Sequence, residues 1–455
     1  MHATDTIVAL STPPGRSGIG VIRISGPDAL ALTRSLLRDE SFKPEPQRVF
    51  LKPLRELDGG EVLDQALVTY FKSPRSFTGE DVVELSCHGS PPLLLSIIDS
   101  LLYLGARAAD AGEFTMRALS SGRLNLTQAE AIRDLIDAQT HAAVRQAARQ
   151  LGGELSARLQ PLKDSLLEII VPLESSLEFV EDDLPEDLAA QVSQKLSTLA
   201  ETVKSLAGTF RTGRLLKEGL HVTLAGRPNV GKSSIFNGLL RLERAIVTEI
   251  PGTTRDTLSE VIDVEGVPVL ITDTAGVRTS SDKIEQLGVE RTRRAIVDAD
   301  LIVVVLDGSQ PLAPEDLEVI EDAAQSRFII ALNKNDLSAH DADRVRDLSN
   351  GATILSVSAK TGAGLDSLCA AIVEPFSAHE TFAGNFIITN ARHYDLLRRT
   401  ENAILTSKDL LSRRASEELV LVGLYDALRF LGEVTGETTP EDVLSQIFST
   451  FCIGK

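Results

Sequence analysis

The chain has 455 residues, of which 43% are hydrophobic and 24% are charged, and its formal net charge at pH 7 is −19. This length predicts about two to four domains with sizeable cores, and the negative charge argues against non-specific attraction to nucleic acid. The three cysteines do not suggest a framework of disulfide bonds. The sequence contains no signal peptide and no apolar run long enough to span a membrane. We therefore expect a cytoplasmic protein of a reducing compartment that is not bound to a membrane.

Residues 1–121 alternate short β-like runs with helix-like runs. This alternation predicts an N-terminal α/β domain. The run from Gly15 to Gly20 is rich in glycine, but its glycines stand in the wrong order for a dinucleotide-binding loop. We interpret this run as a structural loop and expect no second nucleotide site there.

A helical pattern spans residues 122–214, gives way to an α/β pattern over residues 215–378, and resumes over residues 379–455. The spacing of Thr127 and Glu130 predicts a capping box at the start of the first helix. We expect the middle domain to be inserted into one helical domain, because the two ends of a compact domain often lie close together. Two independent helical appendages are the alternative.

The middle domain begins with a phosphate-binding loop. Residues Gly226–Ser233 read G-x-x-x-x-G-K-S, between a strand-like run over residues 221–225 and a helix-like run over residues 234–240. In such a loop, glycines turn backbone N–H groups toward anionic oxygens, and the following helix presents its positive end. We expect Lys232 to reach the terminal phosphates and Ser233 to bind Mg²⁺.

Three further motifs, each at the end of a strand-like run, identify the nucleotide as GTP. Asp273-Thr274-Ala275-Gly276 is suited to the Mg²⁺ water shell and the γ-phosphate. Asn333-Lys334-Asn335-Asp336 resembles the guanine-reading loop of GTPases, in which the Asp carboxylate accepts from two guanine N–H donors that adenine lacks. Ser358-Ala359-Lys360 resembles the loop that closes over the guanine. Together, in this order, the motifs favour GTP over ATP.

The hydrolytic machinery departs from the Ras pattern. Val277 stands where Ras-like GTPases place a Gln that orients the attacking water, and valine cannot hydrogen-bond to water. The run Gly252-Thr253-Thr254-Arg255-Asp256, with Asn229 in the phosphate loop, resembles the potassium-dependent GTPases. In that class, K⁺ neutralises charge that develops in the transition state. The alternative is that Asn229 only stiffens the turn.

The whole chain resembles the MnmE (TrmE) family of tRNA modification GTPases. The resemblance rests on the GTPase motifs together with blocks near both ends. These blocks are residues 5–9, 12–16, 23–26, 76–81, 112–115, 128–138 and the terminal run Ile447–Lys455. The resemblance implies three parts. These are an N-terminal α/β domain that binds tetrahydrofolate and forms a homodimer, a helical domain in two parts, and an inserted Ras-like P-loop GTPase domain.

The resemblance also implies the function. The family works with the flavoprotein MnmG (GidA), as a heterotetramer, on the wobble uridine of certain tRNAs. It adds an aminomethyl-type or carboxymethylaminomethyl-type group at carbon 5, with the one-carbon unit taken from 5-formyl- or 5,10-methylene-tetrahydrofolate. The two GTPase domains of the dimer pair across their switch regions in the presence of GTP and K⁺.

Family roles transfer to matching positions of this chain. Ser233 and Thr254 would bind Mg²⁺; Asn229, with backbone carbonyls near Thr248, Ile250 and Thr253, would hold K⁺. Glu285, twelve residues after Asp273, matches the family's water-orienting glutamate. The full GTP site would comprise Asn229, Val230, Gly231, Lys232, Ser233, Ser234, Thr248, Glu249, Ile250, Pro251, Gly252, Thr253, Thr254, Asp273, Thr274, Ala275, Gly276, Asn333, Lys334, Asp336, Ser358, Ala359 and Lys360.

Tetrahydrofolate would be held by Arg23, Glu84, Arg123 and Lys455. The family often has Lys where Arg123 stands, and the two cations differ in geometry, so this position departs from the pattern. Cys452, in the terminal Cys-Ile-Gly-Lys, is a candidate nucleophile, because a thiolate can attack a one-carbon unit. A small buried residue without chemistry is the alternative reading of Cys452.

A regulatory GTPase of ribosome assembly is the competing functional hypothesis, since such proteins share the phosphate loop and the run after it. They end in RNA-binding modules, whereas this chain ends in a helical pattern without an RNA-binding signature.

Overall fold

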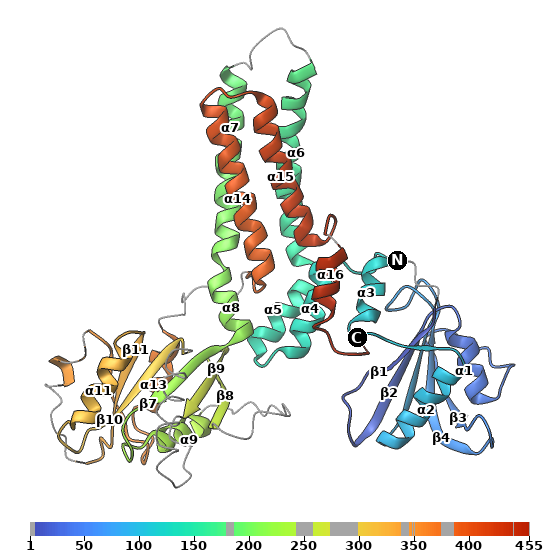
Figure 1. Ribbon diagram of the computed structural model, residues 1–455, viewed down its shortest axis with the longest axis horizontal. Helices are drawn as coiled ribbons and strands as arrows, with labels where there is room; N and C mark the ends of the chain where they lie inside the picture. Colours follow the sequence, from blue (N-terminus) through green and yellow to red (C-terminus); the bar gives the residue numbers. More distant parts are fainter. Residues whose placement is uncertain are drawn as a thin grey trace. The chain divides into compact units, whose positions relative to one another are not determined.

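The computed structural model describes residues 5–178, 186–242, 258–273, 299–337, 345–347, 349, 351–374, 386–439 and 441–454 (Figure 1). By its internal contacts the chain divides into two compact units. The first consists of Met1–Arg133, Gln150–Leu166 and Leu428–Lys455, and the second of Asp134–Arg149 and Leu167–Ala427. Each unit contains one six-stranded sheet.

The sheet of the first unit has the order β3-β4-β5-β2-β1-β6. Its strands are β1 (Ile7–Leu10), β2 (Ser17–Ser25), β3 (Val49–Arg55), β4 (Val62–Phe71), β5 (Val82–Gly89) and β6 (Arg107–Ala108). Helices α1 (Ala29–Leu37) and α2 (Pro91–Tyr103) contribute to the core together with one face of this sheet, through buried residues such as Leu36, Ile97 and Leu101. The α/β prediction for this region is thereby confirmed.

The glycine-rich run near the N-terminus is not a loop along its whole length, because β2 already begins at Ser17. Gly20 lies inside this strand, where a Cβ atom would stand 2.5 Å from Leu94 Cδ1 of α2. The glycine therefore lets the helix pack closely on the strand, which corrects the interpretation of this run as a structural loop.

Three further helices of the first unit are α3 (Glu113–Ser120), α16 (Glu441–Phe448) and the first half of α6 (Glu154–Glu178). The helix α4 (Leu126–Asp137) starts before Thr127, so the predicted capping box at Thr127 and Glu130 is wrong. The box is formed two residues earlier. Asn125 Oδ1 accepts from the Gln128 amide at 2.9 Å, and Gln128 Oε1 accepts from the Asn125 amide at 3.1 Å.

The C-terminal tail packs against the N-terminal sheet region of the same unit. Phe448 and Phe451 are buried in a cluster with Ala129, and Ile453 forms an isolated β-bridge with Ala111. Gly454 requires its glycine, because its φ is +93° and a Cβ atom would lie 2.3 Å from the Leu10 carbonyl oxygen. The last residues of the chain are thus part of the fold of the first domain.

A partly buried ionic cluster joins the residues just before β1 to β6 and α3. The Arg117 guanidinium, 5% exposed, donates to Glu113 Oε1 and to Asp5 Oδ1, both at 2.8 Å. Arg107 also pairs with both carboxylates. Burial by itself raises the pKa of Glu113, but hydrogen bonds from Arg107 and Arg117 outweigh it and leave that pKa below its usual value. The hydrogen bond from Arg107 lowers the pKa of Asp5 as well.

The sheet of the second unit has the order β12-β11-β10-β7-β9-β8, and all pairs are parallel except β8 with β9. The strands are β7 (Leu220–Ala225), β8 (Leu258–Val264), β9 (Val267–Asp273), β10 (Leu301–Asp307), β11 (Phe328–Asn333) and β12 (Ile354–Ser356). Helices α9 (Lys232–Leu242), α11 (Pro314–Ala323) and α13 (Leu365–Val373) contribute to its hydrophobic cores. This is the predicted α/β arrangement of the middle domain.

The other helices that the structure describes in the second unit are α5 (His141–Leu151), α7 (Glu186–Gly208), α8 (Phe210–Glu218), α14 (Ala391–Ser412) and α15 (Glu417–Thr435), with the second half of α6. The chain enters and leaves the α/β domain side by side. Thr209 Oγ1 accepts from the Ile388 amide at 3.0 Å, and the rings of Phe210 and Tyr394 stack at 4.6 Å. This is the arrangement that an inserted domain requires.

The ionic cluster generates a prediction about acid stability. The folded-state pKa values of Asp5 and Glu113 are lowered, so the cluster stabilises the fold above the ordinary carboxyl pKa and loses this contribution as the pH falls through the lowered values. We expect Glu113→Gln to lower the free energy of unfolding by about 2–4 kcal/mol at neutral pH, where it leaves Arg117 short of a partner. Thermal melts across the pH range measure this. The difference in stability between Glu113→Gln and wild type should shrink below about pH 4, and a difference independent of pH would contradict the stabilising role of the ionised cluster.

Candidate GTP-binding site

The phosphate loop joins β7 to α9 at the carboxyl end of the sheet. Gly226 has φ +150°, and a Cβ atom there would lie 2.4 Å from the Val305 carbonyl oxygen. Gly231 has φ +101°, and its Cβ would lie 2.2 Å from Asn333 Nδ2. Between them, Asn229 takes the left-handed conformation with φ 67° and is exposed. The two glycines are therefore fixed by backbone geometry and by contact with β10 and β11.

Lys232 points back into this loop. Its Nζ donates to the Gly226 carbonyl at 2.6 Å and to the Arg227 carbonyl at 3.0 Å, and the residue is 6% exposed. A cation held inside a ring of backbone groups, at the start of a helix, is suited to anionic phosphate oxygens. Ser234 follows in the first turn of α9, where its amide donates to the Gly231 carbonyl at 3.0 Å.

Ser233 and Asp273 are brought together from different elements. Ser233 Oγ donates to Asp273 Oδ2 at 2.6 Å, and Asp273 is fully buried at the end of β9. A hydroxyl and a carboxylate are the oxygen donors that Mg²⁺ prefers beside phosphate. The residues present therefore fit the ion that the sequence predicts here.

Asn333 connects three loops at the same edge of the sheet. Its Nδ2 donates to the Val230 carbonyl at 2.8 Å, and its Oδ1 accepts from the Ala359 amide at 3.0 Å. Asn333 is 2% exposed. The side chain thus sets the distance between the phosphate loop and the two loops that the sequence assigns to the base.

Asp336 lies exposed at this edge with one oxygen fixed. Ser358 Oγ donates to Asp336 Oδ1 at 2.7 Å, and this hydrogen bond lowers the pKa of Asp336. The carboxylate is therefore ionised at neutral pH and can accept N–H donors of a base. Lys360 Nζ stands 4.0 Å from Asp336 Oδ2.

Asp307 is a member of the site that sequence reasoning missed. It ends β10, and its Oδ2 accepts from Lys334 Nζ at 2.6 Å. Burial raises the pKa of Asp307, but hydrogen bonds from Lys334 and Ser309 outweigh it and lower that pKa. Lys334 itself has φ 66°. The signal in the sequence was a polar residue, Asp307, at the end of an apolar run, as with Asp273 and Asn333 at the ends of their own runs.

Part of the predicted site lies outside the described residues. This part comprises Thr248, Glu249, Ile250, Pro251, Gly252, Thr253, Thr254, Thr274, Ala275, Gly276 and Glu285. The carbonyl ligands for K⁺, the second protein ligand for Mg²⁺ and the water-orienting glutamate accordingly stay predictions.

The predicted folate residues fall in the first unit. Arg23 on β2 lies opposite Glu84 on β5 and donates to Glu84 Oε1 at 2.9 Å through Nε. Its Nη1 also donates to the Gly454 carbonyl at 3.3 Å, and its guanidinium lies 5.5 Å from the centre of the Phe77 ring. Arg23, Glu84 and the C-terminal tail are thus brought together. Lys455, the next residue, lies outside the described part.

Arg123 stands on the turn after α3 and is exposed. Its Cγ lies 3.4 Å from the Cβ position of Gly79, two residues after Phe77. Cys452 is exposed, and its carbonyl accepts from the Gly112 amide at 3.4 Å. The reading of Cys452 as a small buried residue is therefore wrong.

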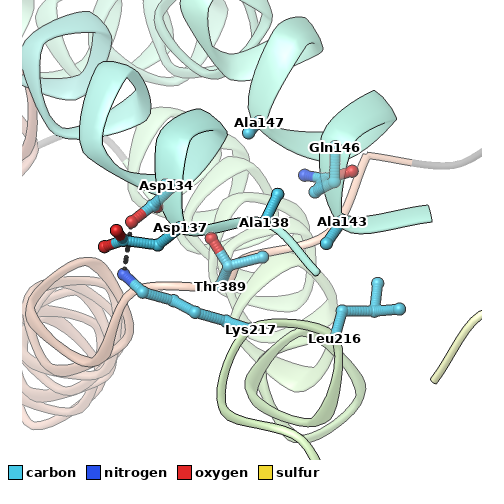
Figure 2. A pocket seen from close by; sticks show the side chains of 9 residues that line it. All are labelled: Asp134, Asp137, Ala138, Ala143, Gln146, Ala147, Leu216, Lys217 and Thr389. Carbon is cyan, nitrogen blue, oxygen red and sulfur yellow. Dashed lines mark ion pairs between the residues drawn. The ribbon is translucent and has the colours of Figure 1, made fainter. Parts of the chain in front are cut away.

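A second polar cluster lies in the second unit, where α4 and α5 approach α8 (Figure 2). It borders a cavity of about 30 Å³. Lys217 Nζ stands 2.7 Å from Asp134 Oδ1, and the Asp134 side chain is 8% exposed. Among the described residues neither Asp134 oxygen accepts a well-directed hydrogen bond, so the pairing is mainly Coulombic. It fixes the end of α8, which leads directly into β7 and the phosphate loop.

Comparisons with known proteins cover the whole chain. The family model described as the MnmE helical domain matches residues 126–452, and the model described as the GTP-binding protein TrmE N-terminus matches residues 6–123. The tRNA modification GTPase MnmE of Koribacter versatilis is 43% identical over 460 residues, covering all of both chains. That of Aquifex aeolicus is 41% identical over 452 residues, covering 99% of this chain and all of its own.

Among solved structures, the G domain of the T. maritima FeoB iron transporter aligns with 34% of this chain and 97% of its own length, at 29% identity and a TM-score of 0.27. Across the helices that the structure describes, none has the length and apolar character needed to cross a membrane.

Proposed function

Because this chain belongs to the MnmE family of tRNA modification GTPases, we propose that it is a K⁺-activated GTPase that works with the flavoprotein MnmG (GidA). Together they would modify carbon 5 of the wobble uridine of certain tRNAs, with a one-carbon unit from tetrahydrofolate. That the chain is a GTPase acting in tRNA modification follows from the family itself. The single observation that carries the finer proposal is the meeting of Arg23, Glu84 and the C-terminal tail in one place.

The GTP chemistry is assigned to the residues at the carboxyl edge of the second sheet. Lys232 would contact the β- and γ-phosphates, and Ser233 with Thr254 would bind Mg²⁺, which neutralises charge on the phosphates. Asn333 and Asp336 would read guanine. The fixed carboxylate of Asp336 supports this role, because it presents an ionised acceptor at the sheet edge.

Asn229 would hold K⁺ together with the carbonyls near Thr248, Ile250 and Thr253. The exposed position of Asn229 within the phosphate loop supports this assignment, since the residue is accessible to an ion that lies beside bound phosphates. K⁺ would stabilise charge that builds up during phosphoryl transfer. Glu285 would orient the attacking water through a bridging water, because a carboxylate in direct contact with phosphate would be repelled.

Tetrahydrofolate would bind beside the Arg23–Glu84 pair. Arg23, Arg123 and Lys455 supply positive charge for the carboxylates of the glutamate tail, and Glu84 can accept from pterin N–H groups. The Arg23 and Glu84 side chains are 18% and 27% exposed, so both are anchored and still accessible. The exposed thiol of Cys452, two residues from Gly454, would act in the one-carbon chemistry as a nucleophile.

A homodimer through the N-terminal domain is the proposed assembly, joined by MnmG in a heterotetramer. The face of the first sheet that carries Arg23 and Glu84 also carries exposed apolar side chains on the edge strand β3 and on its neighbour β4. These are Val49, Leu51 and Leu67, exposed by 59%, 64% and 43%. An apolar patch of this kind on a sheet edge is typical of an interface, and a second copy of the chain would cover it.

Guanine reading can be tested by changing Asp336 to Asn. The amide loses the charged acceptor for two guanine N–H groups and gains a donor that suits a xanthine carbonyl. We expect the affinity for GTP to fall by about 10²–10³-fold and that for xanthosine triphosphate to rise above it, with ATP binding weakly to both proteins. Nucleotide titration measures this, and an unchanged preference for GTP would remove Asp336 from the site.

The tRNA reaction can be tested by reconstitution with MnmG, tRNA, GTP, 5,10-methylene-tetrahydrofolate and an amine donor (ammonium for an aminomethyl group, glycine for a carboxymethylaminomethyl group), followed by mass analysis of the nucleosides. We expect Cys452→Ser to retain GTP hydrolysis and folate binding but to lose nearly all modification, because a hydroxyl is a far weaker nucleophile than a thiolate. Glu84→Gln should bind folate about tenfold more weakly with unchanged GTP hydrolysis. Full modification by Cys452→Ser would reject its chemical role, and a wild type that binds no folate would reject the folate assignment.

A further inference from the structure

The helices α6 and α15 carry apolar residues on two opposite sides. One side forms the core, with Ile170 and Leu173 of α6 and Leu424 of α15 buried. The other side is exposed, with Val171 at 56% and Val422 at 62%. A helix that is apolar on both sides is normally covered on both. The exposed side of these helices is therefore unusual for a surface that faces only water.

The exposed apolar residues lie along one seam. On α6, Leu167 and Val171 are four residues apart, and on α15, Leu419, Val422 and Tyr425 are spaced by three. Such spacings place side chains on the same face of a helix. Tyr425 Oη donates to Glu174 of α6, three residues beyond Val171, which brings the two faces together on the same side of the bundle. We call these five residues the α6–α15 strip.

The charges beside the strip are mainly negative. Glu174 flanks it on α6, and Glu418 is exposed at its end on α15. Among the described residues, Lys195 is paired with Glu168 at 3.5 Å and Arg429 with Glu433 at 3.0 Å, so neither pair adds net charge beside the strip. An apolar strip with a negative border repels the phosphates of tRNA and attracts a surface that is apolar with basic flanks.

We propose that the α6–α15 strip is a docking surface for the protein partner of this GTPase. The partner would contribute an amphipathic helical segment whose apolar face covers the strip and whose Lys and Arg side chains meet Glu174 and Glu418. Long apolar faces on paired helices are suited to such a segment, which would lie along the seam between them. The inference rests on the proposed function for the identity of the partner, MnmG, and adds the surface that it uses.

The test introduces negative charge into the strip. Val171→Glu and Val422→Glu change side chains that are more than half exposed, so the fold should tolerate them. The matched control is Leu405→Glu, an exposed apolar position on α14 outside the strip. Binding of full-length variants to MnmG is measured by titration at low and high salt, alongside GTP hydrolysis, melting temperature and molecular mass.

We expect each strip variant to weaken MnmG binding by about tenfold or more, with GTP hydrolysis and melting unchanged, and the control to bind like wild type. Glu418→Lys should bind more weakly at low salt and lose part of the salt dependence. Equal MnmG binding by the strip variants and wild type overturns the proposal. A strip variant whose oligomeric mass changes in the absence of MnmG also overturns it, because the strip would then contact a second copy of the chain. A strip variant with altered tRNA affinity would assign the strip to RNA instead. A wild type that does not bind MnmG at all instead rejects the partner in the proposed function.

Discussion

The two hydrogen bonds of Asn333 hold the nucleotide site together. The phosphate loop, the loop that carries Asp336 and the loop that carries Ala359 belong to different crossovers of the sheet, and a single buried amide connects them. The close approach of Asn333 to Gly231 explains why a side chain is not tolerated at that glycine. The distance between the phosphate loop and the two loops assigned to the base is therefore fixed, as a nucleotide of fixed length requires.

A second constraint acts at the chain terminus. The tail passes so close to Leu10 that only glycine fits at position 454. The carbonyl oxygen of Gly454 accepts a hydrogen bond from Arg23 Nη1. Residues 431 positions apart in sequence are thereby held in contact. This arrangement places the residues that follow α16 beside Arg23 in the first unit.

Much of this organisation could be predicted from the sequence, because glycine and polar residues placed regularly at the ends of apolar strands are typical of a nucleotide site and of few other structures. The phosphate loop, the guanine motifs and the alternation of the first domain are of this kind. The helix start at Asn125 was misplaced, since Asn125–Gln128 and Thr127–Glu130 both satisfy a capping pattern and only packing selects between them. The ion pair of Lys334 with Asp307, and the junction pair of Asp134 with Lys217, depend on how separate elements meet, which local patterns do not encode.

The most direct test of the account is GTP hydrolysis by the full-length protein and by Asn229→Gly, in KCl and in NaCl at equal ionic strength. Glycine is the matched replacement, because it adopts the φ of 67° found at Asn229 without strain while removing the amide. The account predicts that wild type hydrolyses GTP at least about tenfold faster in KCl and that Asn229→Gly binds GTP but loses this preference. Equal wild-type rates in the two salts would contradict cation-assisted hydrolysis.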